Sequence, residues 1–64
     1  SGTRTAIVTG GIRPMREEPN LSAAVAYRAE PGVVGRITDC KNGWCRIDVG
    51  GRKGWIETGH IWGD

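Results

Sequence analysis

Apolar residues occur along this chain in short bursts separated by turn residues, which is the pattern of a small all-β fold. Almost every window long enough for a helix is interrupted by Gly or Pro. The bursts predict five strands, at residues 5–9, 33–40, 44–49, 54–57 and 61–62. We therefore expect a single sheet of short strands with little or no helix.

Turn residues mark the connections between the last four predicted strands. Asn42-Gly43 supplies the positive-φ positions that a tight reversal needs. A second, glycine-rich turn is predicted over residues 50–54, and Thr58-Gly59-His60 is predicted to form a 3₁₀ turn before the last strand. These signals favour a meander of neighbouring strands.

The segment between the first two predicted strands is long, polar and rich in prolines and charges. Residues 20–30 form its longest window without Gly or Pro, so either a helix or a loop fits there. We predict a loop with at most one turn. A loop near 20 residues is usually functional or contains a hairpin.

Alternation of residue types separates the two faces of the strand at 44–49. Cys45, Ile47 and Val49 fall on one face, which is predicted to be the core. Trp44 falls on the other face with Arg46 and Asp48. A large aromatic side chain on the outside of a small domain requires an explanation, and a binding surface is one.

The length of the chain allows one hydrophobic core. It has 64 residues, 11 Gly and no Phe, and 38% of its residues are hydrophobic. A domain of this size buries only about 60% of the surface that its unfolded chain exposes, so a crosslink would add useful stability. We expect residues 1–4 to be a disordered tail, with Ser1-Gly2 a remnant of cloning, and residues 5–64 to be the single domain.

Charge and hydropathy disfavour two classes of partner. The net charge of +2 is too small for a dedicated nucleic-acid binder, so no nucleic acid is expected. No apolar run approaches the roughly 20 residues of a membrane helix, so no membrane insertion is expected. These 64 residues show no signal-peptide pattern, and the location must be inferred indirectly.

Cys40 and Cys45 would face each other across a hairpin whose turn is Asn42-Gly43. A structural disulfide is the favoured interpretation, with two free thiols or a metal or redox role as alternatives. A closed zinc site needs four ligands, and only His60 could join the two cysteines, so we predict no metal. A disulfide would indicate a periplasmic or extracellular location.

Four segments together resemble the bacterial SH3-like domain family. Residues 42–47 followed by 54–56 resemble its paired "NGW" and "GWV" motifs, while residues 13–19 and 30–34 resemble the entry and exit of its first long loop. The cysteine spacing and the closing residues 61–63 are most similar to a branch found in Gram-negative envelope proteins. The resemblance implies a small SH3-like barrel of about five strands, with a long first loop and a 3₁₀ turn before the last strand.

The resemblance also implies a shallow aromatic groove beside the long loop. Its expected residues are Trp44, Trp55, Glu57 and His60, with Tyr27 or the Glu17-Glu18 loop as the far wall. Indole combines a large apolar area with one N–H donor, which suits recognition. Packing over a core without Phe is the alternative role of the tryptophans. Residues 13–16 lack aromatics, which argues against recognition of PxxP peptides.

Catalysis has no support in the sequence. The chain has one His, and neither a nucleophile spaced with a base nor a phosphate-binding glycine loop. We therefore expect no enzyme activity, no catalytic residue and no cofactor.

We predict a non-catalytic binding module for a cell-wall peptide or an envelope protein partner, which is a monomer or a weak dimer. The alternative is a structural domain that uses Trp62 and the last strand to dock a neighbouring domain or a second copy. Nucleic-acid binding, suggested by the Arg and Trp content, is disfavoured by the small net charge.

Overall fold

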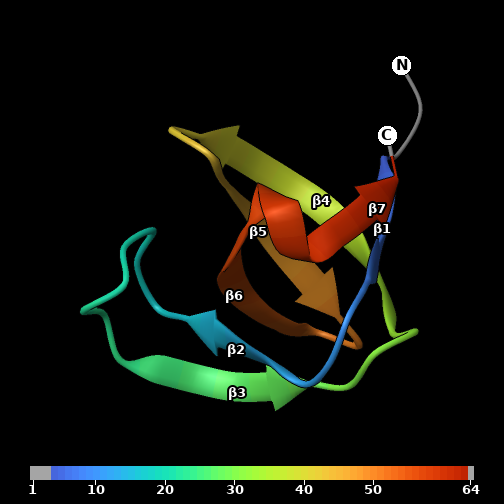
Figure 1. The fold of residues 1–64 in the computed structure, drawn as a ribbon. Coiled ribbons are helices and arrows are strands. Elements are labelled where there is room, and N and C mark those ends of the chain that lie inside the picture. Colours follow the sequence, from blue (N-terminus) through green and yellow to red (C-terminus); the bar gives the residue numbers. More distant parts are fainter. Residues whose placement is uncertain (1–3, 64) are drawn as a thin grey trace.

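The computed structural model describes residues 4–63, which form seven strands and one 3₁₀ turn (Figure 1). Residues 1–3 of the predicted tail lie outside the described residues. The backbone carbonyl of Arg4 accepts a hydrogen bond of 2.8 Å from the Ile37 N–H. The elements are β1 (Thr5–Val8), β2 (Arg13–Arg16), β3 (Val25–Ala29), β4 (Val34–Lys41), β5 (Trp44–Val49), β6 (Arg52–Glu57), the 3₁₀ turn Thr58–His60 and β7 (Ile61–Gly63).

All seven strands belong to one antiparallel sheet in the order β3-β2-β6-β5-β4-β1-β7. Buried residues of β1, β2, β3, β5 and β6 join one core cluster, so the sheet must curl around that core (Figure 1). The first and last strands pair, with Ile7 opposite Trp62. The predicted all-β, SH3-like fold is confirmed, including the 3₁₀ turn before the last strand.

The long segment before β4 contains a hairpin, which adds two strands to the five predicted. β2 pairs with β3, and residues 17–24 form the loop between them. Residues 20–30 are therefore not one irregular loop, because Val25–Ala29 is a strand. Small and charged residues in β3 concealed its alternation, in which Ala26 and Arg28 are exposed while Ala29 is buried.

Two tight turns have the backbone that their residues predict. Asn42 and Gly43 have φ of 52° and 83°, and Gly50 and Gly51 have φ of 58° and 90°. Two consecutive positive-φ residues form a type I′ turn, whose twist matches that of the flanking strands. The second turn is shorter than predicted, so β6 begins at Arg52, two residues earlier than expected.

The core is aliphatic, and its central side chain is a methionine. Met15, Ile47, Ile56 and Val8 are at most 2% exposed. Cys45 is also buried and Val49 packs against the cluster, as the alternation in β5 predicts. Met15 was placed in a loop by the sequence pattern, yet it is fully buried. A flexible thioether side chain fills irregular space, which suits a core that has no Phe.

Two glycines let strands approach this core closely. A Cβ atom at Gly54 would lie 2.6 Å from the Met15 Cβ and 3.1 Å from its backbone carbonyl carbon. A Cβ atom at Gly35 would overlap the Ile47 side chain. Neither glycine has a positive φ, so their role is to leave space between β2, β4 and the β5–β6 hairpin.

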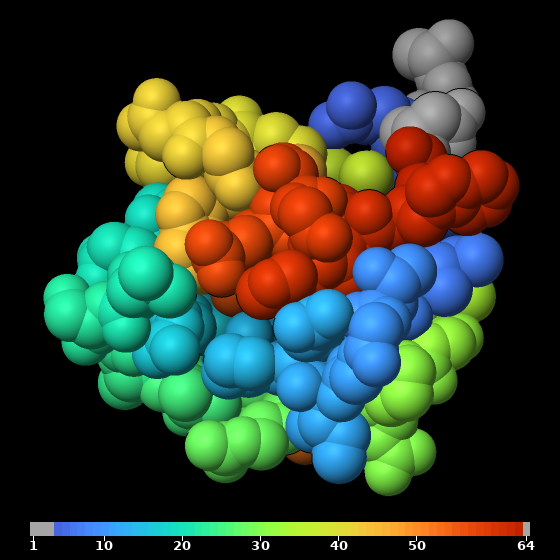
Figure 2. All heavy atoms as spheres, in the orientation of Figure 1, coloured from blue at the N-terminus to red at the C-terminus, as the bar shows by residue number. Residues whose placement is uncertain are grey.

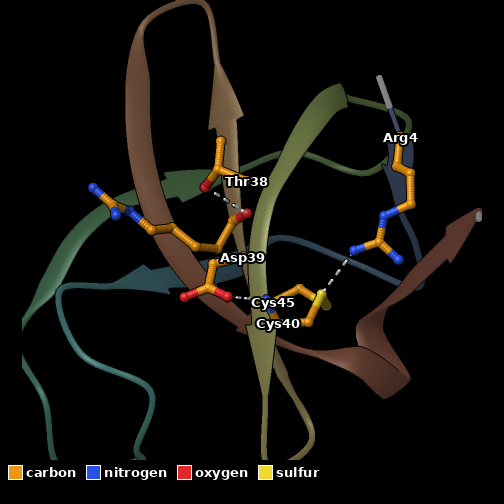
Figure 3. Close-up of a disulfide and its surroundings, with 6 residues drawn as sticks. Arg4, Thr38, Asp39, Cys40 and Cys45 are labelled. Atoms are coloured by element: carbon orange, nitrogen blue, oxygen red, sulfur yellow. Dashed lines mark hydrogen bonds between the residues drawn. A yellow bond between two sulfur atoms is a disulfide. The ribbon is translucent and has the colours of Figure 1, made fainter. Parts of the chain in front are cut away.

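A disulfide joins Cys40 of β4 to Cys45 of β5, next to the Asn42-Gly43 turn (Figure 3). The two residues are direct cross-strand partners, with Cα atoms 4.0 Å apart and sulfur atoms 2.09 Å apart. The Arg4 guanidinium donates to the Cys40 Sγ at 3.6 Å. The favoured interpretation of the cysteine pair is thereby supported, and both cysteines are engaged.

The space at Gly54 predicts a steric penalty for any side chain there. Gly54→Ala should lower the free energy of unfolding by about 1–3 kcal/mol, because the new methyl group overlaps Met15 and its backbone. Urea denaturation followed by tryptophan fluorescence measures this. Gly59→Ala is the matched control, since nothing lies within 4 Å of its Cβ position. Equal stability of the two variants would contradict the packing described.

Reduction of the disulfide should destabilise the domain by about 2 kcal/mol, since it removes a crosslink that closes a short loop in the unfolded chain. Urea midpoints measured with and without a phosphine reductant test this. The double variant Cys40→Ala and Cys45→Ala should be insensitive to the reductant. An intact mass that does not rise by two hydrogen atoms on reduction would show that the cysteines are not bonded.

Candidate functional site

Strand register places three cross-strand pairs on the outer face of β5 and β6. Trp44 lies opposite Glu57, Arg46 opposite Trp55, and Asp48 opposite Lys53. Directly opposed residues share a face of the sheet. Trp44 and Trp55 are therefore diagonal neighbours on a surface that is otherwise charged.

Trp55 lies in the middle of this face with cationic side chains around it. Arg16 of β2 is its partner on one side and Arg46 of β5 its partner on the other. The Lys41 ammonium lies 5.6 Å from the centroid of the Trp55 ring, within cation–π range. Trp55 is only 8% exposed, because its neighbours cover much of the indole.

A hollow of about 450 Å³ lies next to Trp55, and we call it the Trp55 hollow. Its lining combines three cations, two acids and the indole: Arg16, Arg46, Lys53, Glu17, Glu18 and Trp55. The loop of residues 17–24 forms one wall. Figure 2 shows this loop in teal at the same end of the molecule as the yellow turn between β4 and β5.

The polar contacts at this end tie its loops together. The Arg16 guanidinium donates to the Ala23 carbonyl at 2.8 Å, which bridges the loop of residues 17–24. The Thr58 N–H donates to the Gly43 carbonyl at 2.9 Å, which joins the 3₁₀ turn to the β4–β5 turn. Hydrogen bonds to backbone carbonyls thus hold the loop that lines the Trp55 hollow and, at the same end of the molecule, the β4–β5 turn.

The structure brings most of the predicted groove residues to this side of the molecule. Trp55, Glu17 and Glu18 line the Trp55 hollow, while Trp44 and Glu57 lie on the same outer face. His60 lies beside Glu57, with 3.8 Å between Nδ1 and Oε1. Of the two far walls considered from the sequence, the Glu17-Glu18 loop is the one at the hollow.

Tyr27 lies elsewhere, at a second hollow of about 300 Å³ that Val33, Val49 and Arg52 also line. Neighbouring residues of a strand face opposite ways, so Ala26 faces the Trp55 hollow and Tyr27 does not. The Tyr27 hydroxyl donates to the Arg52 carbonyl at 3.1 Å, and the Arg52 guanidinium lies 4.3 Å from the ring centroid. Burial raises the pKa of Tyr27, and the charge of Arg52 opposes this rise.

Three cations of the hollow were not among the residues predicted from sequence. Arg46 shares the alternation phase of Trp44, and Lys53 shares that of Trp55, so strand phase could have identified both. Arg16 carried no such signal, because its strand was predicted as a loop.

Other chemical features are few. Within residues 4–63, no three side chains of His, Cys, Asp or Glu gather where a metal ion could bind. The described chain also holds no helix long and apolar enough to cross a membrane. The Trp55 hollow combines an indole with charged groups of both signs, which is chemistry suited to recognition.

Comparison with protein families identifies a family to which most of the chain is similar. The model of the family described as "Bacterial SH3 domain" matches residues 10–63, which include β2 to β7 and every residue named at the Trp55 hollow. Neither the search of curated proteins nor that of solved structures finds a match.

Burial of Tyr27 predicts that its phenol ionises with a pKa above the ordinary value for tyrosine. Alkaline titration of the tyrosinate absorbance should give a midpoint above about 10, the ordinary pKa of tyrosine. The chain has one Tyr, so the signal is unambiguous. Since the folded state favours the neutral phenol, this residue contributes stability below pH 10 that is lost as pH rises through its folded pKa. A midpoint at or below 10 in the folded protein would contradict the burial described.

Proposed function

The chain belongs to the bacterial SH3 domain family, and from this membership we propose that it binds cell-wall peptide through the Trp55 hollow. Domains of this type are small binding modules that generally bind peptides or proteins and are non-catalytic. The observation that carries the proposal is the hollow itself, in which an indole lies between cationic and acidic side chains.

The chemistry of the hollow suits a short peptide with charged groups. The exposed edge of the largely buried Trp55 indole offers a small apolar area, while Arg46 and Lys53 offer donors for carboxylates. Glu17 and Glu18 offer acceptors for amines. Stem peptides of the cell wall carry both kinds of group, which is why we propose them as the ligand.

The location that we propose is the periplasm or the outside of the cell. The Cys40–Cys45 disulfide supports it, because such bonds persist in oxidising compartments and are rare in the cytosol. The bacterial family fits the same location. A ligand in the cell wall would be accessible there.

A second candidate function is docking of a protein at the edge of the sheet that ends in β7. Trp62 of β7 is 73% exposed and Val34 of β4 is 58% exposed, and both are register partners of Ile7 in β1. The three apolar side chains therefore form a row across neighbouring strands. This row favours a contact with a neighbouring domain, an envelope protein or a second copy.

Titration with soluble muropeptides, followed by heteronuclear NMR, tests the first proposal. We expect shifts for the Trp55 indole and for amides of residues 16–18, 44–46 and 53–57. Lys53→Gln, which removes a cation that lines the hollow, should weaken binding by about fivefold, the effect of losing roughly 1 kcal/mol at a contact residue. Trp62→Ala is the control and should bind as the wild type does.

Two outcomes would count against the cell-wall ligand. Absence of any shift around Trp55 at millimolar muropeptide would reject it. Shifts confined to Trp62, Ile7 and Val34 would place the muropeptide at the edge strand β7 and its neighbours, and would also reject the Trp55 hollow as its site.

A further inference from the structure

Charges of opposite sign flank Trp55 on different strands. Arg46 lies on β5, on one side of Trp55, whereas Glu17 and Glu18 follow β2, on the other side, where the Arg16 guanidinium is engaged with the Ala23 carbonyl. Neighbouring strands lie about 4.8 Å apart, so β2 and β5 are about 10 Å apart across β6. Arg46 is thus separated from the two acids by the width of a small ligand group, with the Trp55 indole between them.

The charged side chains on the two sides of Trp55 are not paired with one another within the described part of the molecule. The ion pairs among residues 4–63 are Arg36 with Asp48, at 3.2 Å, and the longer contact of His60 with Glu57. Arg46, Lys53, Glu17 and Glu18 line one hollow without forming an ion pair with one another. The space between them can therefore admit a group that pairs with both signs.

We infer that the Trp55 hollow takes a zwitterionic amino-acid end of a peptide, with its carboxylate at Arg46 and Lys53 and its ammonium at Glu17 and Glu18. The inference rests on the proposed function and names the chemical group that the site selects. The hydrocarbon chain between the two charges would lie against the exposed edge of the Trp55 indole. A ligand with a single charge would leave one side of the hollow without a partner.

The geometry also assigns different roles to the two sides. Arg46 projects from the middle of a paired strand and is half-buried, so it offers a positioned donor for a carboxylate. Glu17 and Glu18 are exposed on a loop, and the Arg16 contact to Ala23 holds that loop. The cationic side, which binds the ligand carboxylate, is therefore the more selective one. The acidic side, on a loop, adapts to the position of the ligand amine.

Three synthetic peptides test the inference by NMR titration. The first is N-acetyl-Ala-Ala-Lys with a free carboxylate and a free side-chain amine, the second is its C-terminal amide, and the third carries an acetylated lysine amine. We expect the first to shift the Trp55 indole in a saturable way. Loss of either charge should weaken binding by about fivefold, as for a partly exposed ion pair.

Variants assign each charge to its side of the hollow. Arg46→Gln should weaken binding of the free-acid peptide by about fivefold and leave binding of the C-terminal amide unchanged. The double variant Glu17→Gln and Glu18→Gln should weaken binding of the peptides with a free amine and leave binding of the acetylated peptide unchanged. Arg46→Lys keeps the charge and should keep the preference for acid over amide. Arg28→Gln is the matched control, because Arg28 lines the other hollow.

Equal affinity for the acid and the amide would overturn the carboxylate anchor, and equal affinity for free and acetylated amine would overturn the ammonium anchor. Absence of shifts with all three peptides would overturn the inference as a whole. The proposed function is tested separately with muropeptides: it fails only if they too leave the Trp55 signals unchanged. Dispersed amide spectra of each variant show that it has folded, so a loss of binding reports on the charge.

Discussion

The structure depends on the close approach of β2 to β6 over a glycine. The fully buried Met15 fills the centre of a core that has no Phe, and it does so because Gly54 has no side chain in its path. The contact curls the sheet so that residues of five strands share one core. It also fixes Arg16 beside Trp55, so the packing inside the barrel positions the charges outside it.

Two further restraints act at the end of the molecule that carries the Trp55 hollow. The Cys40–Cys45 disulfide holds the tip of the β4–β5 hairpin, from which Lys41 reaches towards Trp55. The hydrogen bond from Arg16 holds the loop on the other side. The loop of residues 17–24, which lines the hollow, and the β4–β5 turn near Trp55 are therefore each held by a local link. The ligand specificity that we infer therefore depends on restraints outside the core.

Strong local signals explain what could be predicted from the sequence. Asn42-Gly43 predicts its turn because few residues tolerate two consecutive positive φ angles. The alternation in β5 predicts both the buried Ile47 and the outward Trp44, which the structure places as expected. The two cysteines could be paired because that hairpin sets them opposite each other.

The parts that could not be predicted depend on contacts between distant segments. β2 has the sequence Arg-Pro-Met-Arg and β3 is rich in alanine, so neither has the β-branched pattern of a strand, and each is stabilised by pairing with the other. Of the cations at the candidate site, Arg16 was missed for the same reason, whereas strand phase could have identified Arg46 and Lys53. Tyr27 could not be assigned to a hollow before the register of β3 was known, because one residue of register changes the face.

The pairing of β1 with β7 brings both ends of the described chain to one edge of the sheet, on the side opposite the loop of residues 17–24 (Figure 1). The path of the chain is therefore nearly a closed ring. A short linker between the ends would complete that ring, and the exposed Asn42-Gly43 turn or the loop of residues 17–24 offers places to open it again. A chain joined and opened in this way would keep every strand neighbour while changing the order in which the strands are synthesised.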